Sequence, residues 1–220
     1  MIRVGIADSG VDGPARVVVC ARADFGSEGQ ACVPQEAPRD RAGHGSALAA
    51  LIANTGTVEL LDARIFDAEL RASAAQSAAA IDWLADQGAS IVNLSFGLRE
   101  DREVLREACA RALSRGVVLV ASVPARGAAV FPAAYPGVIR ATGDARCAPG
   151  EVSWLGTAQA DAGGAVRTPC GRVVGASAGC AHVTSALASL MHRQPSATRE
   201  ELLEAFRREA RYQGPERRLS

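Results

Sequence analysis

Residues 175–191, with the sequence GASAGCAHVTSALASLM, constrain the fold of this chain more than any other segment. A short entry bounded by glycine leads into a helical segment that carries small or apolar residues on every face. A helix without a polar stripe must be covered on all sides, so we expect it to run through the centre of the protein. The small residues of its first turn allow other elements to approach closely.

Ser177 stands at the start of this expected helix. Free backbone N–H groups and the positive end of the helix dipole favour developing negative charge there, which suits a nucleophile. Serine is also a preferred N-cap residue, so this segment alone leaves both roles open.

The composition is that of a globular protein with one domain. The chain has 220 residues, of which 48% are apolar and 22% charged. The formal net charge is zero, which gives no electrostatic reason to expect nucleic acid as a partner. No apolar run is long enough to span a bilayer, and the first residues begin a strand pattern rather than a signal peptide. We therefore expect a cytoplasmic protein that does not bind a membrane.

Six cysteines form no CxxC pair, which argues against a structural zinc site. Without an export signal we expect reduced thiols, with Cys20, Cys109 and Cys180 as small buried residues. The glycines near the N-terminus do not form the GxGxxG fingerprint of a dinucleotide site. We expect neither a metal nor an organic cofactor.

Short apolar strands alternate with helical segments along the chain. The expected strands are 2–7, 16–20, 58–65, 89–94 and 116–123, and the expected helices are 44–54, 70–87, 100–115, 177–192 and 198–211. This alternation predicts an α/β fold with a mostly parallel sheet covered by helices on both faces. Residues 21–42, 126–136 and 143–171 show no clear element. We expect a single domain over 1–213 and a flexible C-terminal tail over 214–220.

Three polar residues supply the groups that a catalytic serine requires. Asp8 ends the first strand, at the edge of a parallel sheet that faces the ligand crevice. His44 lies between two glycines in DRAGHGS, where a base is easily approached. A serine nucleophile needs a base for its proton and a carboxylate that orients the imidazole. Asp8, His44 and Ser177 occur in the order of the subtilisin triad.

These motifs resemble those of the subtilisin-like (subtilase) serine protease family. The resemblance rests on DSG at Asp8, DRAGHGS at His44 and GASAGCAHV at Ser177, with support from IVNLSFG at 91–97 and FPAAYPGVI at 131–139. It implies a compact version of the three-layer subtilisin-like fold. It also implies a serine endopeptidase in which Asp8, His44 and Ser177 are catalytic.

The same resemblance implies a substrate cleft and one unusual peptide bond. The cleft would lie between two segments that flank an extended peptide: Ser95, Phe96 and Gly97 on one side, and Ser122, Val123 and Pro124 on the other. Pro124 replaces a glycine of the family and predicts a narrowed pocket. The Phe131–Pro132 bond is expected to be cis.

An α/β-hydrolase is excluded by the order of residues. GASAG fits the GxSxG elbow of that fold, which then requires an acid and a histidine after the serine. No Asp or Glu occurs between Ser177 and either later histidine, His182 or His192. By resemblance to the family, His182 is structural.

The chain departs from the family at the oxyanion hole, where Ala125 replaces an asparagine and Ala176 a threonine. The Ser177 N–H is then the identifiable donor, and Arg126 is a candidate substitute. The family's insertion for its main calcium site is also missing, so no tight calcium is expected.

Fewer donors suggest a slow enzyme, suited to one cut in a dedicated substrate. We expect a cytosolic processing protease whose partner is a peptide or protein with a cleavable leader or pro-segment. It is similar to the leaderless maturation protease that processes the small subunit of quinohemoprotein amine dehydrogenase. The alternative is a pseudoprotease that binds a peptide or partner without cutting it, although the intact triad argues against this.

Overall fold

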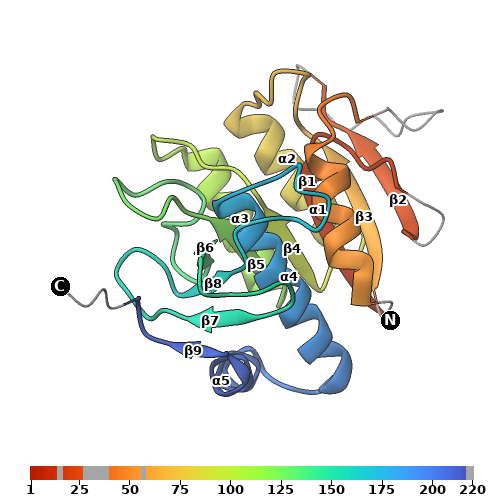
Figure 1. Cartoon of the computed structure of the whole chain (residues 1–220). Helices are drawn as coiled ribbons and strands as arrows, with labels where there is room; N and C mark the ends of the chain where they lie inside the picture. Colours follow the sequence, from red (N-terminus) through yellow and green to blue (C-terminus); the bar gives the residue numbers. More distant parts are fainter. Residues whose placement is uncertain (14–16, 27–39, 56–57, 217–220) are drawn as a thin grey trace.

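A computed structural model of the chain describes residues 1–13, 17–26, 40–55 and 58–216. Its centre is a nine-stranded sheet with the order β2-β3-β1-β4-β5-β6-β8-β7-β9 (Figure 1). The strands are β1 Ile2–Asp8, β2 Val19–Asp24, β3 Val58–Arg64, β4 Ile91–Leu94, β5 Val118–Ser122, β6 Ile139–Gly143, β7 Val152–Trp154, β8 Ala162–Gly164 and β9 Tyr212–Gln213. The helices are α1 His44–Ile52, α2 Ala74–Asp86, α3 Glu103–Ser114, α4 Ala176–Arg193 and α5 Arg199–Glu209.

Both faces of the sheet are apolar. Alternate residues of a strand point to opposite sides, and the central strands carry apolar residues at both sets of positions. In β1, Val4 and Ile6 belong to one buried cluster and Ala7 to the other. Helices α1, α4 and α5 cover the first face, and α2 and α3 cover the second (Figure 1). Neighbouring strands pair in parallel, apart from antiparallel β7 and β8. The predicted α/β fold, a mostly parallel sheet between two helical layers, is confirmed.

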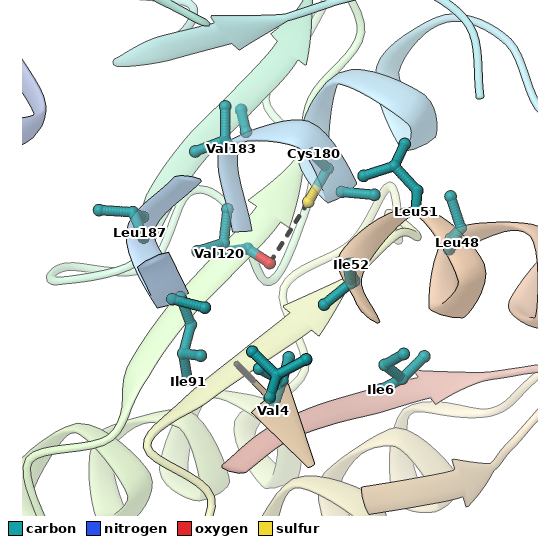
Figure 2. Close-up of a cluster of buried hydrophobic side chains, with 14 of the residues drawn as sticks. Val4, Ile6, Leu48, Leu51, Ile52, Ile91, Val120, Cys180, Val183 and Leu187 are labelled. Atoms are coloured by element: carbon teal, nitrogen blue, oxygen red, sulfur yellow. Dashed lines mark hydrogen bonds between the residues drawn. The ribbon is translucent and has the colours of Figure 1, made fainter. Parts of the chain in front are cut away.

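Helix α4 is the central helix expected from residues 175–191. Its side chains are buried on nearly every face, from Ala178 to Leu190. Figure 2 shows α4 and α1 packed together over the strands, through the side chains Cys180, Val183, Leu187, Leu48, Leu51, Ile52, Val4, Ile91 and Val120. The Cys180 thiol lies 3.5 Å from the carbonyl oxygen of Val120.

Two glycines allow the backbone of α4 to touch the backbone of the sheet. A Cβ atom on Gly179 would lie 2.1 Å from the carbonyl oxygen of Thr142 and 2.6 Å from the nitrogen of Gly143, both in β6. A Cβ atom on Gly164 of β8 would lie 2.6 Å from the Cβ of His182. The first turns of α4, including Ser177, are therefore seated directly on the sheet.

The N-terminal edge of the sheet differs from the sequence prediction. Strand β2 covers Val19–Asp24 rather than 16–20, so 21–24 are strand and not irregular. The predicted burial of Cys20 is wrong, since this residue is exposed. The register with β3 shifts between Val19 and Ala21, and such a bulge leaves Cys20 outside the ladder. Cys109 and Cys180 are buried as predicted.

The start of α2 and the late strands were also mispredicted. Helix α2 begins at Ala74 and not at 70, because Ser73 and Gln76 form a reciprocal capping box. Strands β6, β7, β8 and β9 were not predicted, since none of them carries an apolar run or a clear alternation of apolar and polar residues. The expected start of the last helix is confirmed, with Thr198 accepting a hydrogen bond from the N–H of Glu201.

The C-terminal segment is held to the sheet further than predicted. Strand β9 pairs with β7, and the next residue, Gly214, donates to the carbonyl oxygen of Trp154 at 2.8 Å. Arg146 donates to the carbonyl oxygen of Gly214 at 2.8 Å. Gly214 therefore belongs to the fold and not to a free tail, while 217–220 lie outside the described residues.

We predict that Gly179→Ala destabilises the protein. Helix propensity alone favours alanine by about 1 kcal/mol, but the new methyl group collides with the backbone of β6. We expect a net loss of at least about 2 kcal/mol in the free energy of unfolding, measured by urea denaturation. The matched control is Gly26→Ala, where no atom of the described residues lies within 4 Å of a new Cβ and the change should stay within about 0.5 kcal/mol. Equal stability of Gly179→Ala and the parent protein would contradict the packing argument.

Candidate active site

Asp8 is a buried carboxylate at the end of β1. It faces α1 and α4 because Val4 and Ile6, at the preceding alternate positions, face the same side. Its Oδ1 accepts a hydrogen bond from the N–H of Ser9 at 2.8 Å and lies 2.8 Å from Nδ1 of His44. Among the described residues its Oδ2 has no hydrogen-bond partner, although it is buried.

The glycines on either side of His44 bring its ring to Asp8. Gly43 is the N-cap of α1 and has a φ of 71°, a left-handed conformation that favours glycine. A Cβ atom on Gly45 would lie 2.3 Å from the carbonyl oxygen of Gly10 and 3.2 Å from the Cβ of Asp8. The helix can therefore begin against the loop that follows β1, which is the physical reason for the GHG sequence.

Asp40 fixes the turn that leads into α1. Its Oδ1 accepts from the N–H of Gly43 at 2.7 Å, and its Oδ2 accepts from the N–H of Ser46 at 2.8 Å. Burial raises the pKa of Asp40, but the hydrogen bonds from Ser46 and Gly43 outweigh it and leave the pKa lowered. The motif DRAGHGS contains Asp40 but does not by itself indicate this role. The available signal was an Asp three residues before a helix-initiating glycine.

The site stabilises the protonated form of His44. Burial lowers the pKa of the imidazole, but the hydrogen bond and charge of Asp8, together with the charge of Asp40, outweigh burial. The pKa of His44 is therefore raised above its ordinary value of 6.5. A general base passes through this imidazolium state when it removes a proton, so the two carboxylates favour that step.

Ser177 lies inside the first turn of α4 and is not its cap. The N-cap is Gly175, with a φ of 78°, so the N-cap alternative for Ser177 is wrong. The Ser177 hydroxyl donates to the carbonyl oxygen of Ser95 at 3.4 Å, and the Ser95 hydroxyl donates to the carbonyl oxygen of Ser177 at 3.4 Å. Across the described residues, no hydrogen bond joins Ser177 to His44.

A buried polar network holds Ser95, the residue that exchanges two hydrogen bonds with Ser177. Asn93 of β4 is fully buried, donates to the Ser95 hydroxyl at 2.9 Å and accepts from the Thr184 hydroxyl of α4 at 3.0 Å. These bonds tie β4 to α4 at the level of Ser177. His182 is also buried on α4, and its Nε2 lies 3.1 Å from the carbonyl oxygen of Arg167. Burial lowers the pKa of His182, which favours its neutral form.

The two predicted cleft segments follow neighbouring strands at the edge of the sheet that carries Asp8. Residues 95–97 follow β4, and the segment 122–124 begins at Ser122, the last residue of the neighbouring strand β5. Ser95 and Ser122 are buried, whereas Pro124 is exposed and its carbonyl oxygen accepts from Nε2 of Gln159 at 2.9 Å. Phe96 packs edge-on against Phe66, with ring centroids 6.0 Å apart.

A cavity of about 540 Å³ lies next to these segments, but the catalytic candidates do not line it. Of the six predicted cleft residues, Val123 alone lines this cavity. Its other walls come from residues 129–140, from the segment around Gln159 and from α5. The Phe131–Pro132 bond is cis, as expected from the family resemblance.

Alanine stands at the two positions where the family resemblance places side-chain donors for the oxyanion hole. Ala125 lies in the exposed segment that follows β5, and Ala176 is the first residue of α4. Arg126 is exposed and forms no ion pair with any carboxylate in the described ranges. The first-turn N–H groups of α4, including that of Ser177, have no partner within the helix.

Asp62 is a second buried carboxyl group near Asp8, which sequence reasoning missed. It is 1% exposed; its Oδ2 accepts from the N–H of Val11 at 3.0 Å and lies 3.3 Å from Nη1 of Arg22. Its Oδ1 has no hydrogen-bond partner in the described part of the chain. Burial, with a smaller contribution from the charge of Asp8, raises its pKa to about 7 despite the charge of Arg22. The available signal was an acid within the apolar strand VELLDAR.

The described ranges contain neither a membrane-spanning helix nor a cluster of metal ligands. No helix there is both long and apolar enough to cross a membrane. No group of three or more His, Cys, Asp or Glu side chains in those ranges is arranged to hold a metal ion.

Comparison with known proteins gives one family and several related folds. The sequence model of the subtilase family matches residues 2–140. A search of curated proteins found no match. Among solved structures, sphericase is 17% identical with a TM-score of 0.69, and the alignment covers 94% of this chain and 82% of sphericase.

Two further solved structures are similar. A serine-to-alanine mutant of the protease domain of PatA is 19% identical with a TM-score of 0.66, covering 92% of this chain and 84% of that one. A psychrophilic protease is 17% identical with a TM-score of 0.68, covering 94% and 82%. At these identities the structural likeness establishes a shared fold, and family membership rests on the sequence match.

The position of Asp62 predicts a pH-dependent stability. Folded Asp62 keeps its proton up to a pKa of about 7, whereas an unfolded Asp loses its proton near 3.9. The free energy of unfolding should therefore fall as the pH rises from about 4 to 7, by an amount on the order of 2–4 kcal/mol. Asp62→Asn cannot ionise, so it should gain stability relative to the parent protein between pH 5 and pH 7.5 in urea denaturation.

The control for this comparison is Asp86→Asn, which alters an exposed ion pair with Arg115. Its stability relative to the parent protein should change by less than about 0.5 kcal/mol over the same pH range. If the difference between Asp62→Asn and the parent protein is the same at both pH values, Asp62 is not protonated in the folded state.

Proposed function

Because the chain belongs to the subtilase family of serine endopeptidases, we propose that it removes a leader or pro-segment from a dedicated peptide or protein substrate. In this proposal Asp8, His44 and Ser177 form the catalytic triad. The observation that carries the assignment is the 2.8 Å contact between Nδ1 of His44 and the buried carboxylate of Asp8. Ser177 stands on the first turn of α4, which packs against α1.

The proposed reaction begins with the Ser177 hydroxyl, which turns from the carbonyl oxygen of Ser95 toward His44. Catalytic hydrogen bonds in a free enzyme often form fully only when substrate is present. Nε2 of His44 accepts the proton as Oγ attacks the scissile carbonyl carbon, and Asp8 stabilises the imidazolium. His44 then gives the proton to the leaving amine. Water, activated by His44, releases the acyl group from Ser177.

The negative charge in this reaction develops on the carbonyl oxygen, close to the first turn of α4. The N–H of Ser177 is the donor that we assign to it. Ala125 and Ala176 supply no side-chain donor, and the loss of one such donor costs a subtilisin about 10²–10³ in kcat. A slow catalyst is sufficient for a single cut in one substrate, which supports the proposed role over bulk degradation.

We also propose that this enzyme acts in the cytoplasm, as a maturation protease of the kind that processes quinohemoprotein amine dehydrogenase. Cys20, Cys109, Cys147, Cys170 and Cys180 are free thiols in the structure, which is the state expected in a reducing compartment. A slow enzyme that makes a single cut fits one dedicated substrate. The substrate itself would be a peptide or protein with a cleavable segment.

A pseudoprotease that binds a peptide without cutting it is the second candidate. Ala125 and Ala176 motivate it, because both positions lack a donor. The buried contact between Asp8 and His44 favours the enzyme instead, since a protein that only binds peptides has no need of an oriented imidazole.

The first functional prediction is covalent labelling of Ser177 by a fluorophosphonate. Labelling should be abolished by Ser177→Ala and His44→Ala, and Asp8→Asn should slow it by about 10⁴-fold. The labelling rate should rise as the pH passes the pKa of His44, which is raised above 6.5, because only the neutral imidazole accepts a proton. Mass spectrometry of the labelled peptide identifies the site. Folded parent protein that stays unlabelled would favour the pseudoprotease.

The second functional prediction is that Ala125→Asn raises kcat on a cleavable peptide. A side-chain amide at this position would donate to the oxyanion, and the gain should be at most about 10²–10³-fold. KM should change little, because the new bond forms mainly in the transition state. Arg126→Ala is the counter-test: if Arg126 already fills the oxyanion hole, its loss lowers kcat and Ala125→Asn gains nothing. If both variants match the parent enzyme, chemistry is not rate-limiting.

A further inference from the structure

The hairpin between β8 and α4, residues 166–175, leads directly into the helical turn that carries Ser177. Its arms are joined by hydrogen bonds from the N–H of Gly175 to the carbonyl oxygen of Val166 at 2.8 Å and from Thr168 to Val173 at 3.0 Å. In Figure 1 this part of the chain leaves β8, reaches across to α1 and returns to the start of α4. The hairpin thus connects the element that carries His44 with the element that carries Ser177.

The base of this hairpin is fixed and its tip is exposed. Thr168 and Val173 are 2% and 5% exposed, and the carbonyl oxygen of Arg167 lies 3.1 Å from the ring of the buried His182. Residues 169–172 are exposed. The tip therefore presents its side chains from a defined position.

Arg172, at this tip, lies directly over the backbone before His44. A Cβ atom on Gly43 would be 2.3 Å from Nη1 of Arg172 and 3.3 Å from its Cζ. The guanidinium group therefore occupies the space that a side chain at 43 would fill. Gly43 lacks a side chain, and this lets the guanidinium group lie beside the residue that carries the base.

Arg172 and Arg41, which precedes Gly43 by two residues, have no carboxylate partner in the described part of the chain. Both are exposed, and neither forms an ion pair there, whereas most other arginines of that part do. The nearby carboxylate of Asp40 is already engaged by Gly43 and Ser46. Within the described residues, the N–H donors of the Arg172 guanidinium are not engaged by a carboxylate, and their planar arrangement suits a carboxylate ligand.

The position of the hairpin relative to Ser177 identifies which part of a peptide it would contact. Ser95, which follows β4, exchanges two hydrogen bonds with Ser177, and we assign the acyl part of the substrate to this side of Ser177. The hairpin approaches Ser177 from the side of α1. In the proposed reaction His44 protonates the leaving amine, so the leaving fragment must begin next to His44.

We propose that Arg172 binds a carboxylate of the leaving fragment, so that the enzyme prefers Asp or Glu at the first or second residue after the scissile bond. This inference rests on the proposed endopeptidase function. It assigns a substrate class, a peptide that is acidic just after the cut, to a residue outside the triad. Arg41 adds positive charge to the same rim.

The test is cleavage of a peptide library of random sequence, with the cut sites determined by mass spectrometry. Asp and Glu should be enriched at the first or second position after the cut, and Arg172→Gln should remove the enrichment. For the best sequence, matched peptides with Glu, Gln or Arg at that position should show kcat/KM about three- to tenfold higher for Glu than for Gln. Arg172→Gln should reduce this ratio to about 1, and Arg172→Glu should favour the Arg peptide.

The matched control is Arg208→Gln, an exposed arginine on α5, which should keep the preference for Glu. Cleavage without an acidic preference, or a preference that survives Arg172→Gln, would overturn this inference and leave the endopeptidase proposal intact. Protein that neither reacts with a fluorophosphonate nor cleaves any peptide would overturn both. Protein that reacts but cleaves nothing would likewise overturn both, since neither proposal survives without peptide hydrolysis.

Discussion

The backbone contact between α4 and the sheet is the constraint on which the rest of this structure depends. Gly179 places the helix against the carbonyl oxygen of Thr142 in β6, and Gly164 of β8 approaches the same helix at His182. A helix seated this deeply must be apolar around its circumference, and it must be entered through a tight turn, here Gly175. The same seating brings Ser177 to the ends of the parallel strands, where Asp8 also lies.

The second organising contact is electrostatic and joins β1 to α1. His44 reaches the buried carboxylate of Asp8 because Gly43 and Gly45 allow the helix to begin against the loop after β1. Asp40 holds that helix start through backbone N–H groups, and its charge adds to that of Asp8 at the imidazole. A base supported by two carboxylates is therefore a product of packing at one helix terminus.

Some residues around the Asp8–His44 pair hold the site together, and others are placed to contact the substrate in the proposed reaction. Asn93 ties β4 to α4 beneath Ser177 through the hydroxyls of Ser95 and Thr184. The hairpin that leads into α4 carries Arg172 across to Gly43, the residue before His44. The protein thus combines the Asp8–His44 pair of the proposed triad with alanine at both expected oxyanion-donor positions and with exposed arginines near the base.

The fold class, the central helix and the three candidate catalytic residues could be predicted from the sequence. These depend on local signals: apolar periodicity, flanking glycines and the order of Asp8, His44 and Ser177. Strands β6 to β9, the exposure of Cys20 and the surroundings of Asp40, Asp62 and Arg172 became visible only in the folded protein. Short strands exist only because neighbours pair with them, and the pKa of Asp62 depends on burial beside Asp8. Contacts between residues far apart in the chain leave no periodic signal, so only the folded protein reveals them.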